Sequence, residues 1–159
     1  MLFRSFTAAA SYIDAKLKQP FILFGTVTAP AGQRLPLTPK FKGNFVGRYE
    51  WSGAGEDSFH VQLDGAYIGE RDPVITTADL LKTGVLPDYF TLGASAGVVH
   101  NGWELEAYVR NLTDARGQQS RAARCNINYC GPTTADPVGE IYRIYIQPRT
   151  IGLRLGRKF

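Results

Sequence analysis

Hydrophobic and polar residues alternate with a period of two over much of the chain. In the clearest run, 103–111, the odd positions from Trp103 to Val109 are apolar, and the even positions from Glu104 to Arg110 are charged or Tyr. Successive side chains of a β-strand point to opposite faces, so the pattern predicts strands with one apolar face. Six strands are predicted in this way, at 2–17, 41–51, 59–68, 89–100, 103–111 and 150–159.

The connections between these strands differ regularly in length. Asn101-Gly102 separates two alternating runs, and this dipeptide favours a two-residue hairpin because both of its residues adopt positive φ readily. The order along the chain is long, short, long, short, long, at 19–40, 52–58, 73–88, 101–102 and 112–149. This rhythm is typical of a transmembrane β-barrel, which has short turns on one side and long loops on the other.

Aromatic residues stand near the ends of the predicted apolar faces. Trp51 and Phe59 flank one short turn, Trp103 follows the other, and Phe159 ends the chain. An aromatic girdle at a membrane interface would place them so, although aromatic residues also favour strands for packing reasons alone.

Composition and charge leave both soluble and membrane classes open. The 159 residues suffice for one domain, and 44% hydrophobic with 20% charged residues suits a soluble protein and a β-barrel alike. No stretch approaches ~18 consecutive apolar residues, which excludes a transmembrane helix. The start, Met1-Leu2-Phe3-Arg4, does not resemble a signal peptide, so a fragment of an exported protein is expected. The net charge of +4 comes without a recognisable module, so no nucleic-acid partner is expected.

Few residues suggest chemistry. Cys125 and Cys130 form a small-loop disulfide in the preferred interpretation and stay two free thiols in the alternative. His60 and His100 are isolated within strand patterns, which disfavours a metal site. No Ser-His-Asp grouping, G-x-S-x-G motif or phosphate-binding glycine loop is present, so neither an enzyme nor a bound cofactor is expected.

Four stretches, taken in order, resemble one known family. They are Ser11-Tyr12-Ile13-Asp14-Ala15-Lys16, Leu35-Pro36-Leu37-Thr38-Pro39-Lys40, Val109-Arg110-Asn111-Leu112-Thr113-Asp114, and the terminal run from Pro148 to Phe159. Taken together, the four stretches make the chain resemble the C-terminal end of the TonB-dependent outer-membrane receptors. The pattern differs at Thr113, where Phe is usual, and at Arg157, which has the apolar parity but lies where a long side chain can reach the interface.

The resemblance implies a fold, a location and several partners. Residues 1–159 would be an open segment of a larger transmembrane β-barrel, without the plug domain, in the outer membrane of a Gram-negative bacterium. The barrel-assembly machinery would recognise the last strand through Ile151, Leu153, Leu155 and Phe159. Lipid and lipopolysaccharide would surround the barrel, and TonB would be contacted only through N-terminal parts that this chain does not include.

The implied function is active uptake of a siderophore, a vitamin or a similar nutrient. The long connection at 112–149 carries the candidate ligand-contact residues Arg116, Arg121, Arg124 and Tyr129, which suit an anionic or planar small molecule such as an iron-siderophore. The alternative is a soluble all-β ligand-binding module, such as a lectin-like sandwich, whose strand faces would pack into one core.

Overall fold

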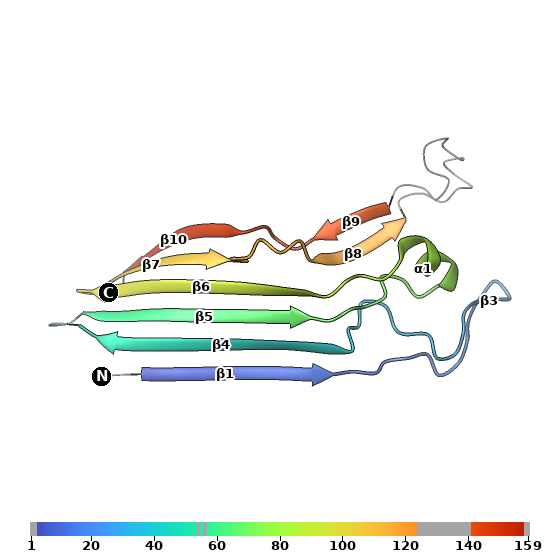
Figure 1. Cartoon of the computed structure of the whole chain (residues 1–159), viewed down its shortest axis with the longest axis horizontal. Coiled ribbons are helices and arrows are strands. Elements are labelled where there is room, and N and C mark those ends of the chain that lie inside the picture. The colour runs from blue at the N-terminus through green and yellow to red at the C-terminus, as the bar shows by residue number, and fades with distance from the viewer. Residues whose placement is uncertain (1–2, 54, 56, 124–140, 158–159) are drawn as a thin grey trace.

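The main element of the structure is a single antiparallel sheet. The computed structural model describes residues 3–53, 55, 57–123 and 141–157. The sheet has the order β1-β4-β5-β6-β7-β10 (Figure 1). Its strands are β1 (Phe3–Tyr12), β4 (Phe41–Ser52), β5 (Ser58–Ile68), β6 (Tyr89–His100), β7 (Trp103–Arg110) and β10 (Thr150–Arg157). This confirms the predicted all-β fold and antiparallel up-and-down meander of six strands.

The short turns and the long connections lie at opposite ends of the sheet (Figure 1). The turn at Asn101-Gly102 has φ of 49° and 75° at its two residues, so the predicted hairpin with two positive φ values is confirmed. The first strand is shorter than predicted, because β1 ends at Tyr12. The chain beyond β1 is held by the hydrogen bond from Ile13 N to Lys40 O and by a bridge between Lys16 and Arg34.

All three long connections carry secondary structure that the period-two pattern did not predict. The first contains the hairpin of β2 (Phe21–Leu23) and β3 (Thr26–Ala29), and the second contains the helix α1 (Thr77–Thr83). The third contains the hairpin of β8 (Gln118–Ala123) and β9 (Ile141–Tyr145). None of these elements joins the six-stranded sheet.

Helix α1 has ordinary capping signals. Thr76 is its N-cap, and the Thr76 hydroxyl accepts a hydrogen bond from the Asp79 backbone N–H. Gly84 ends the helix at a φ of 66°, a conformation that glycine adopts without strain.

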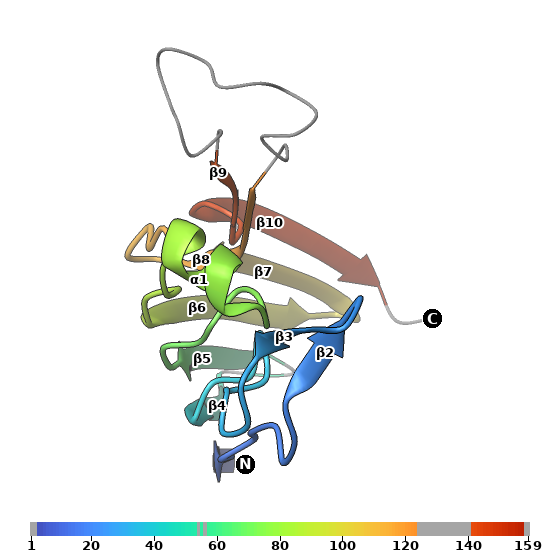
Figure 2. The same cartoon turned by 90° about the vertical axis from the view of Figure 1, so that its right-hand side faces the viewer.

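The sheet is an open single layer, with β1 and β10 at its two edges (Figure 2). Within the described residues, the buried hydrophobic side chains are Ala29 and Leu86, and both belong to the long connections. No apolar core therefore lies against the sheet in the described part of the chain, and its side chains divide between two accessible faces.

Candidate functional site

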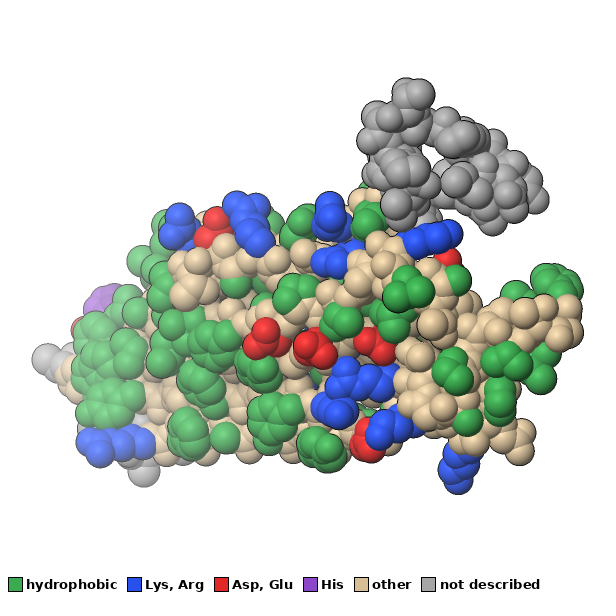
Figure 3. Space-filling model, turned by 45° about the vertical axis from the view of Figure 1, so that its right-hand side comes forward, with side chains coloured by type: hydrophobic (Ala, Val, Ile, Leu, Met, Phe, Trp, Pro, Cys, Tyr) green, Lys and Arg blue, Asp and Glu red, His purple; other side chains and the backbone are tan. Residues whose placement is uncertain are grey.

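One face of the sheet is apolar from edge to edge. The pairing registers place the odd positions of β4, β5 and β7 on the same face as the even positions of β1 and β6. Large side chains exposed on this face are Phe6, Tyr12, Phe41, Val61, Leu63, Phe90, Trp103, Leu105, Ile151, Leu153 and Leu155. In Figure 3, hydrophobic side chains cover much of the strand region, and charged side chains gather where it meets the long connections. We call this surface the apolar face.

Aromatic rings on the apolar face contact one another across strands. Phe45 stacks with Phe6 on one side and with Phe90 on the other, at centroid distances of 6.4 and 6.5 Å. The second contact passes over Gly65, where an added Cβ would lie 2.5 Å from the Phe45 ring. A glycine covered by neighbouring rings keeps the sheet surface continuous, because the rings fill the space that its missing side chain leaves.

A second aromatic group lies at the short-turn end of the apolar face. The Trp51 ring lies 5.3 Å from the Tyr49 ring and 5.6 Å from the Phe59 ring. Two arginines on the same face cover aromatic rings: Arg4 lies 5.1 Å from the Tyr49 centroid and Arg157 5.0 Å from the Trp103 centroid. Amphipathic side chains thus mark this end of the apolar face, as at a boundary between apolar and aqueous media.

The border of the apolar face runs obliquely to the strands. The residue opposite Arg4 across the sheet on β10 is Leu153, whereas Arg157 lies four residues closer to the short turns. At the other end, the row that contains Ile151 meets β1 at Phe6, six residues before Tyr12. The offsets of four and six residues correspond to ~13–20 Å along the strand direction, and the two edge strands lie ~24 Å apart across the sheet. The border therefore slants by ~30–40° from the perpendicular to the strands.

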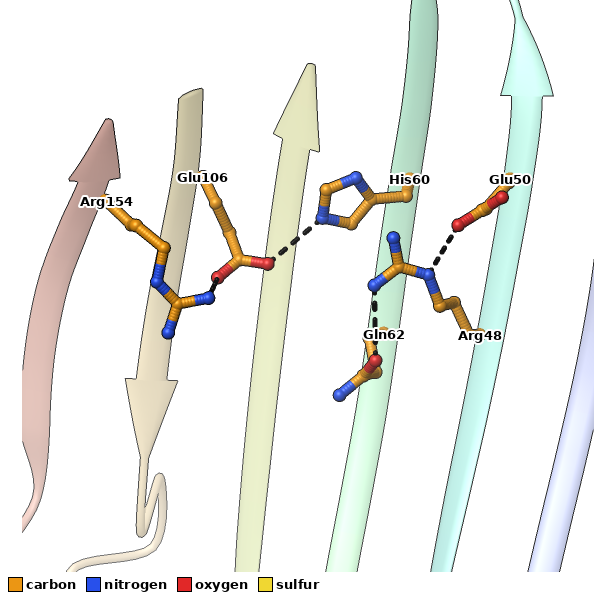
Figure 4. A network of polar contacts seen from close by, with 6 residues as sticks. All are labelled: Arg48, Glu50, His60, Gln62, Glu106 and Arg154. Atoms are coloured by element: carbon orange, nitrogen blue, oxygen red, sulfur yellow. Dashed lines mark hydrogen bonds and ion pairs between the residues drawn. The ribbon is translucent and has the colours of Figure 1, made fainter. Parts of the chain in front are cut away.

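The opposite face is polar and carries a network of ionic contacts, shown in Figure 4. Glu106 on β7 accepts a hydrogen bond from Arg154 on β10 at 2.9 Å, and its other oxygen lies 3.1 Å from His60 Nε2 on β5. Glu106 and His60 are only 8% and 4% exposed. We call this surface the polar face. Its contacts link β10 to β7 and β7 to β5, although β6 lies between β7 and β5.

A glycine makes this contact geometrically feasible. Gly97 on β6 lies directly between His60 and Glu106 in the register. The imidazole of His60 lies over Gly97, where an added Cβ would come 2.8 Å from Nε2. Any larger residue would lift the imidazole off the sheet, so Gly97 is the residue that allows His60 to reach Glu106 across an intervening strand.

The long connection after β7 is closed at its base by Asn111 and Asp114. The Asn111 amide donates to Ala115 O at 3.0 Å and to Gln147 O at 2.9 Å, and its oxygen accepts from Ala115 N at 2.9 Å. Asp114 accepts from the Arg149 backbone N–H at 2.9 Å. The Asn-Leu-x-Asp stretch of the family resemblance therefore ties the end of β7 to the segment that precedes β10.

Replacing Asn111 by Ala should loosen this closure. Three side-chain hydrogen bonds are lost, and the residue keeps a φ of 49° that Ala tolerates less well. We expect unfolding to become easier by ~1.5–3 kcal/mol. Urea denaturation monitored by circular dichroism measures the change. The control is Asn44→Ala on β4, where the described residues give the side chain no hydrogen bond, and its effect should stay within ~0.5 kcal/mol.

The closure should also depend on pH through Asp114. The hydrogen bond from Arg149 N–H, with the nearby Arg116, holds the pKa of this carboxyl below its ordinary value of 3.8. Because the folded-state pKa is depressed, its contribution to stability is complete above the ordinary value and is lost as pH falls through the lower folded value. Exchange protection of the Arg149 amide should therefore fall in acid. In Asp114→Asn the protection should lack this acid transition, and an unchanged transition would contradict the assignment.

The second and third long connections contact each other at one end of the sheet. Arg71 is 5% exposed, lies 5.5 Å from the Tyr89 ring centroid, and donates to Gln118 O at 2.6 Å. Arg121 donates to Thr83 O in α1 and to the Gln118 side chain. These contacts attach the β8–β9 hairpin to α1, so the two connections form one polar cap at this end.

The predicted site residues are placed as follows. Ile151, Leu153 and Leu155 lie on the apolar face of β10 with exposures of 76%, 75% and 67%. Arg116 pairs with Asp114 at 3.0 Å and Arg121 holds α1. Phe159, Arg124, Tyr129 and the pair Cys125 and Cys130 lie outside the described residues. The roles of these residues in assembly and ligand contact, and the disulfide, stay predictions.

Sequence reasoning missed four of the residues that organise the polar face and the cap. Glu106 and His60 have the polar parity of their strands, but their contact spans 46 positions and needs the register to be seen. Arg71 lies outside every alternating run. A signal for Gly97 does exist. It lies on the face of its strand that carries small residues, and a glycine in a strand interior often marks a place where a side chain of a neighbouring strand lies over it.

No helix within the described residues is long and apolar enough to span a membrane, and these residues contain no group of three or more potential metal ligands. The observed site is thus a sheet with one exposed apolar face, one polar face with an ionic network, and a polar cap at one end. Comparison of the chain with models of protein families, with curated proteins and with solved structures finds no match.

Proposed function

We propose that this chain is the C-terminal wall segment of a transmembrane β-barrel in a TonB-dependent outer-membrane receptor. The receptor takes up a siderophore, a vitamin or a similar nutrient across the outer membrane. The observation that carries the proposal is the apolar face, which spans all six strands, is accessible throughout, and is bordered by aromatic and arginine side chains. In a barrel this face meets lipid, and the polar face lines the interior.

The dimensions of the apolar face support this placement. Trp51 and Phe41 mark its ends on β4 and are ten positions apart, which corresponds to ~33 Å along a strand. Strands of membrane barrels tilt by ~35–45°, and the oblique border of the apolar face has a slope of similar size. At such a tilt, ~33 Å on β4 becomes ~25 Å along the membrane normal, which is the usual height of the apolar band of a barrel. The eight positions from Phe59 to Tyr67 on β5 become ~20 Å in the same way.

The link to nutrient receptors depends on the four stretches that resemble that family. The closure by Asn111 and Asp114 supports it, because it gives the Asn-Leu-x-Asp stretch a physical role at a strand end. In the alternative, a soluble lectin-like module, the apolar face packs against a second sheet. Within the described residues, the other elements, β2–β3, α1 and β8–β9, lie toward one end of the sheet and do not form this second sheet (Figure 1).

The two tryptophans provide a direct test, because Trp51 and Trp103 both lie on the apolar face. The chain is folded in phospholipid bicelles, and its fluorescence is quenched by phosphatidylcholine brominated on the acyl chain. We expect strong quenching, and more from bromine near the ester group than near the chain end, because both residues lie at the border.

The control is a reporter on the polar face. Tyr108→Trp in a background of Trp51→Phe and Trp103→Phe should be quenched much less by the same lipids. Equal, weak quenching of the reporters on both faces would favour the soluble module and would refute the membrane placement.

A further inference from the structure

A shallow trough crosses the apolar face, from Arg4 at the short-turn border on β1 to Ile151 on β10. It has a volume of about 830 Å³, and small residues make up much of its floor: Gly47 on β4, Ala94 and Ala96 on β6, and Ala107 on β7. Larger apolar side chains, among them Leu63, Val109 and Ile151, line the rest. An apolar depression of this kind exposes mainly surface that a hydrocarbon chain can cover favourably.

The trough has a cation at one end. Arg4 lines it, on the edge strand β1, and its guanidinium lies over the Tyr49 ring, which lines the trough as well. Within the described residues Arg4 makes no hydrogen bond or ion pair with another side chain. Stacking on a ring leaves the N–H edges of a guanidinium free to bind an oxyanion, which it contacts with two parallel hydrogen bonds.

From this combination we propose that the apolar face holds an anionic phospholipid, with its phosphate on Arg4 and an acyl chain in the trough. The proposal depends on the membrane placement above and extends it. Charge complementarity selects the occupant: a lipid with net negative charge satisfies Arg4, whereas a zwitterionic head group brings its own cation to the same place.

The chain contains a matched position for comparison. Arg157 also lies on the apolar face, also covers an aromatic ring, and borders the same end of the sheet, but it does not line the trough. The oblique border brings it to a membrane depth similar to that of Arg4. Removing either arginine therefore changes the net charge equally, and only the loss of Arg4 should affect the lipid site.

The experiment measures lipid preference next to Trp51, whose ring lies 5.3 Å from the Tyr49 ring. The Trp103→Phe chain is folded in bicelles of equal amounts of phosphatidylglycerol and phosphatidylcholine, with bromine on one lipid or on the other. We expect phosphatidylglycerol to be about five times as abundant as phosphatidylcholine next to Trp51, which is the effect of one arginine near an anionic lipid.

The variants separate the two parts of the site. Arg4→Gln should abolish the preference, Arg157→Gln should keep it, and Arg4→Lys should keep most of it, which also shows that the variants fold. Ala96→Leu fills the trough without changing a charge and should lower the preference. Equal losses in Arg4→Gln and Arg157→Gln would reduce the effect to general surface charge and overturn the site.

Two further outcomes are decisive. Inorganic phosphate, compared with chloride at equal ionic strength, should leave the preference unchanged, and its loss would identify the occupant as a free anion and refute the lipid. Quenching by both brominated lipids without any preference would refute the lipid site while the membrane placement stands. If neither brominated lipid quenches Trp51, both the lipid site and the membrane placement are refuted.

Discussion

Leu63→Arg should destabilise the sheet in bicelles by ~2–4 kcal/mol, the usual cost of an arginine on the lipid side of a barrel near the bilayer midplane. Leu63 lies on β5 about halfway between Phe59 and Tyr67, which mark the two ends of the apolar face on this strand. Its side chain is 44% exposed in the protein alone. The guanidinium would therefore face hydrocarbon, where no partner from the described sheet can neutralise it.

The measurement is urea denaturation in bicelles, followed by circular dichroism. The matched control is Thr7→Arg on β1, which places the same charge on the polar face, and its effect should stay within ~0.5 kcal/mol. A soluble module with a second sheet on the apolar face would also be destabilised by Leu63→Arg, but without any dependence on lipid. A change that is the same with and without bicelles would therefore count against the membrane placement.

Gly97→Val is expected to have the second large effect, because it acts on the ionic network of the polar face. An added Cβ meets the His60 imidazole and lies 3.0 Å from the Leu105 backbone oxygen. The imidazole must move away, and Glu106, which is 8% exposed, then loses one of its two partners. Overpacking together with a buried carboxylate that has lost a partner should cost ~2–4 kcal/mol.

The control for this change is Gly156→Ala, also on the polar face. An added Cβ there lies 3.8 Å from the Glu104 Cβ, an ordinary contact, so the substitution should be neutral or slightly stabilising. Denaturation midpoints of the two variants give the comparison. If Gly97→Val unfolds at the same urea concentration as the wild-type chain, His60 does not lie across Gly97 in solution.

The strands of the sheet were predictable because each meets two different environments. Tyr89–His100 and Trp103–Arg110 agree with the predicted runs to within a residue, since alternation records which side chains face water and which do not. The elements of the long connections lack this contrast. Strand β2 has three residues, too few for a period, and β8 is a largely polar run from Gln118 to Ala123.

Contacts across the sheet were less predictable than the strands themselves. Helix α1 carried readable signals in Thr76, Asp79 and Gly84, but seven residues are too few for a helical period to stand out. The pair of His60 and Glu106 required the register of three strands, which the sequence gives only for the hairpin at Asn101-Gly102. The same limit applies to Asn111, whose partner Gln147 is 36 positions away.

The uneven lengths of the connections have a consequence for the order in which the strands assemble. β6 and β7 are joined by two residues, whereas 39 residues separate the end of β7 from the start of β10. Loop closure costs ~0.6 kcal/mol more for each doubling of loop length, and tight hairpins form within microseconds. We expect the β6–β7 hairpin to nucleate folding and β10 to join last, which pulse-labelled hydrogen exchange can resolve. The strand with the most exposed apolar side chains would then spend the longest time unpaired.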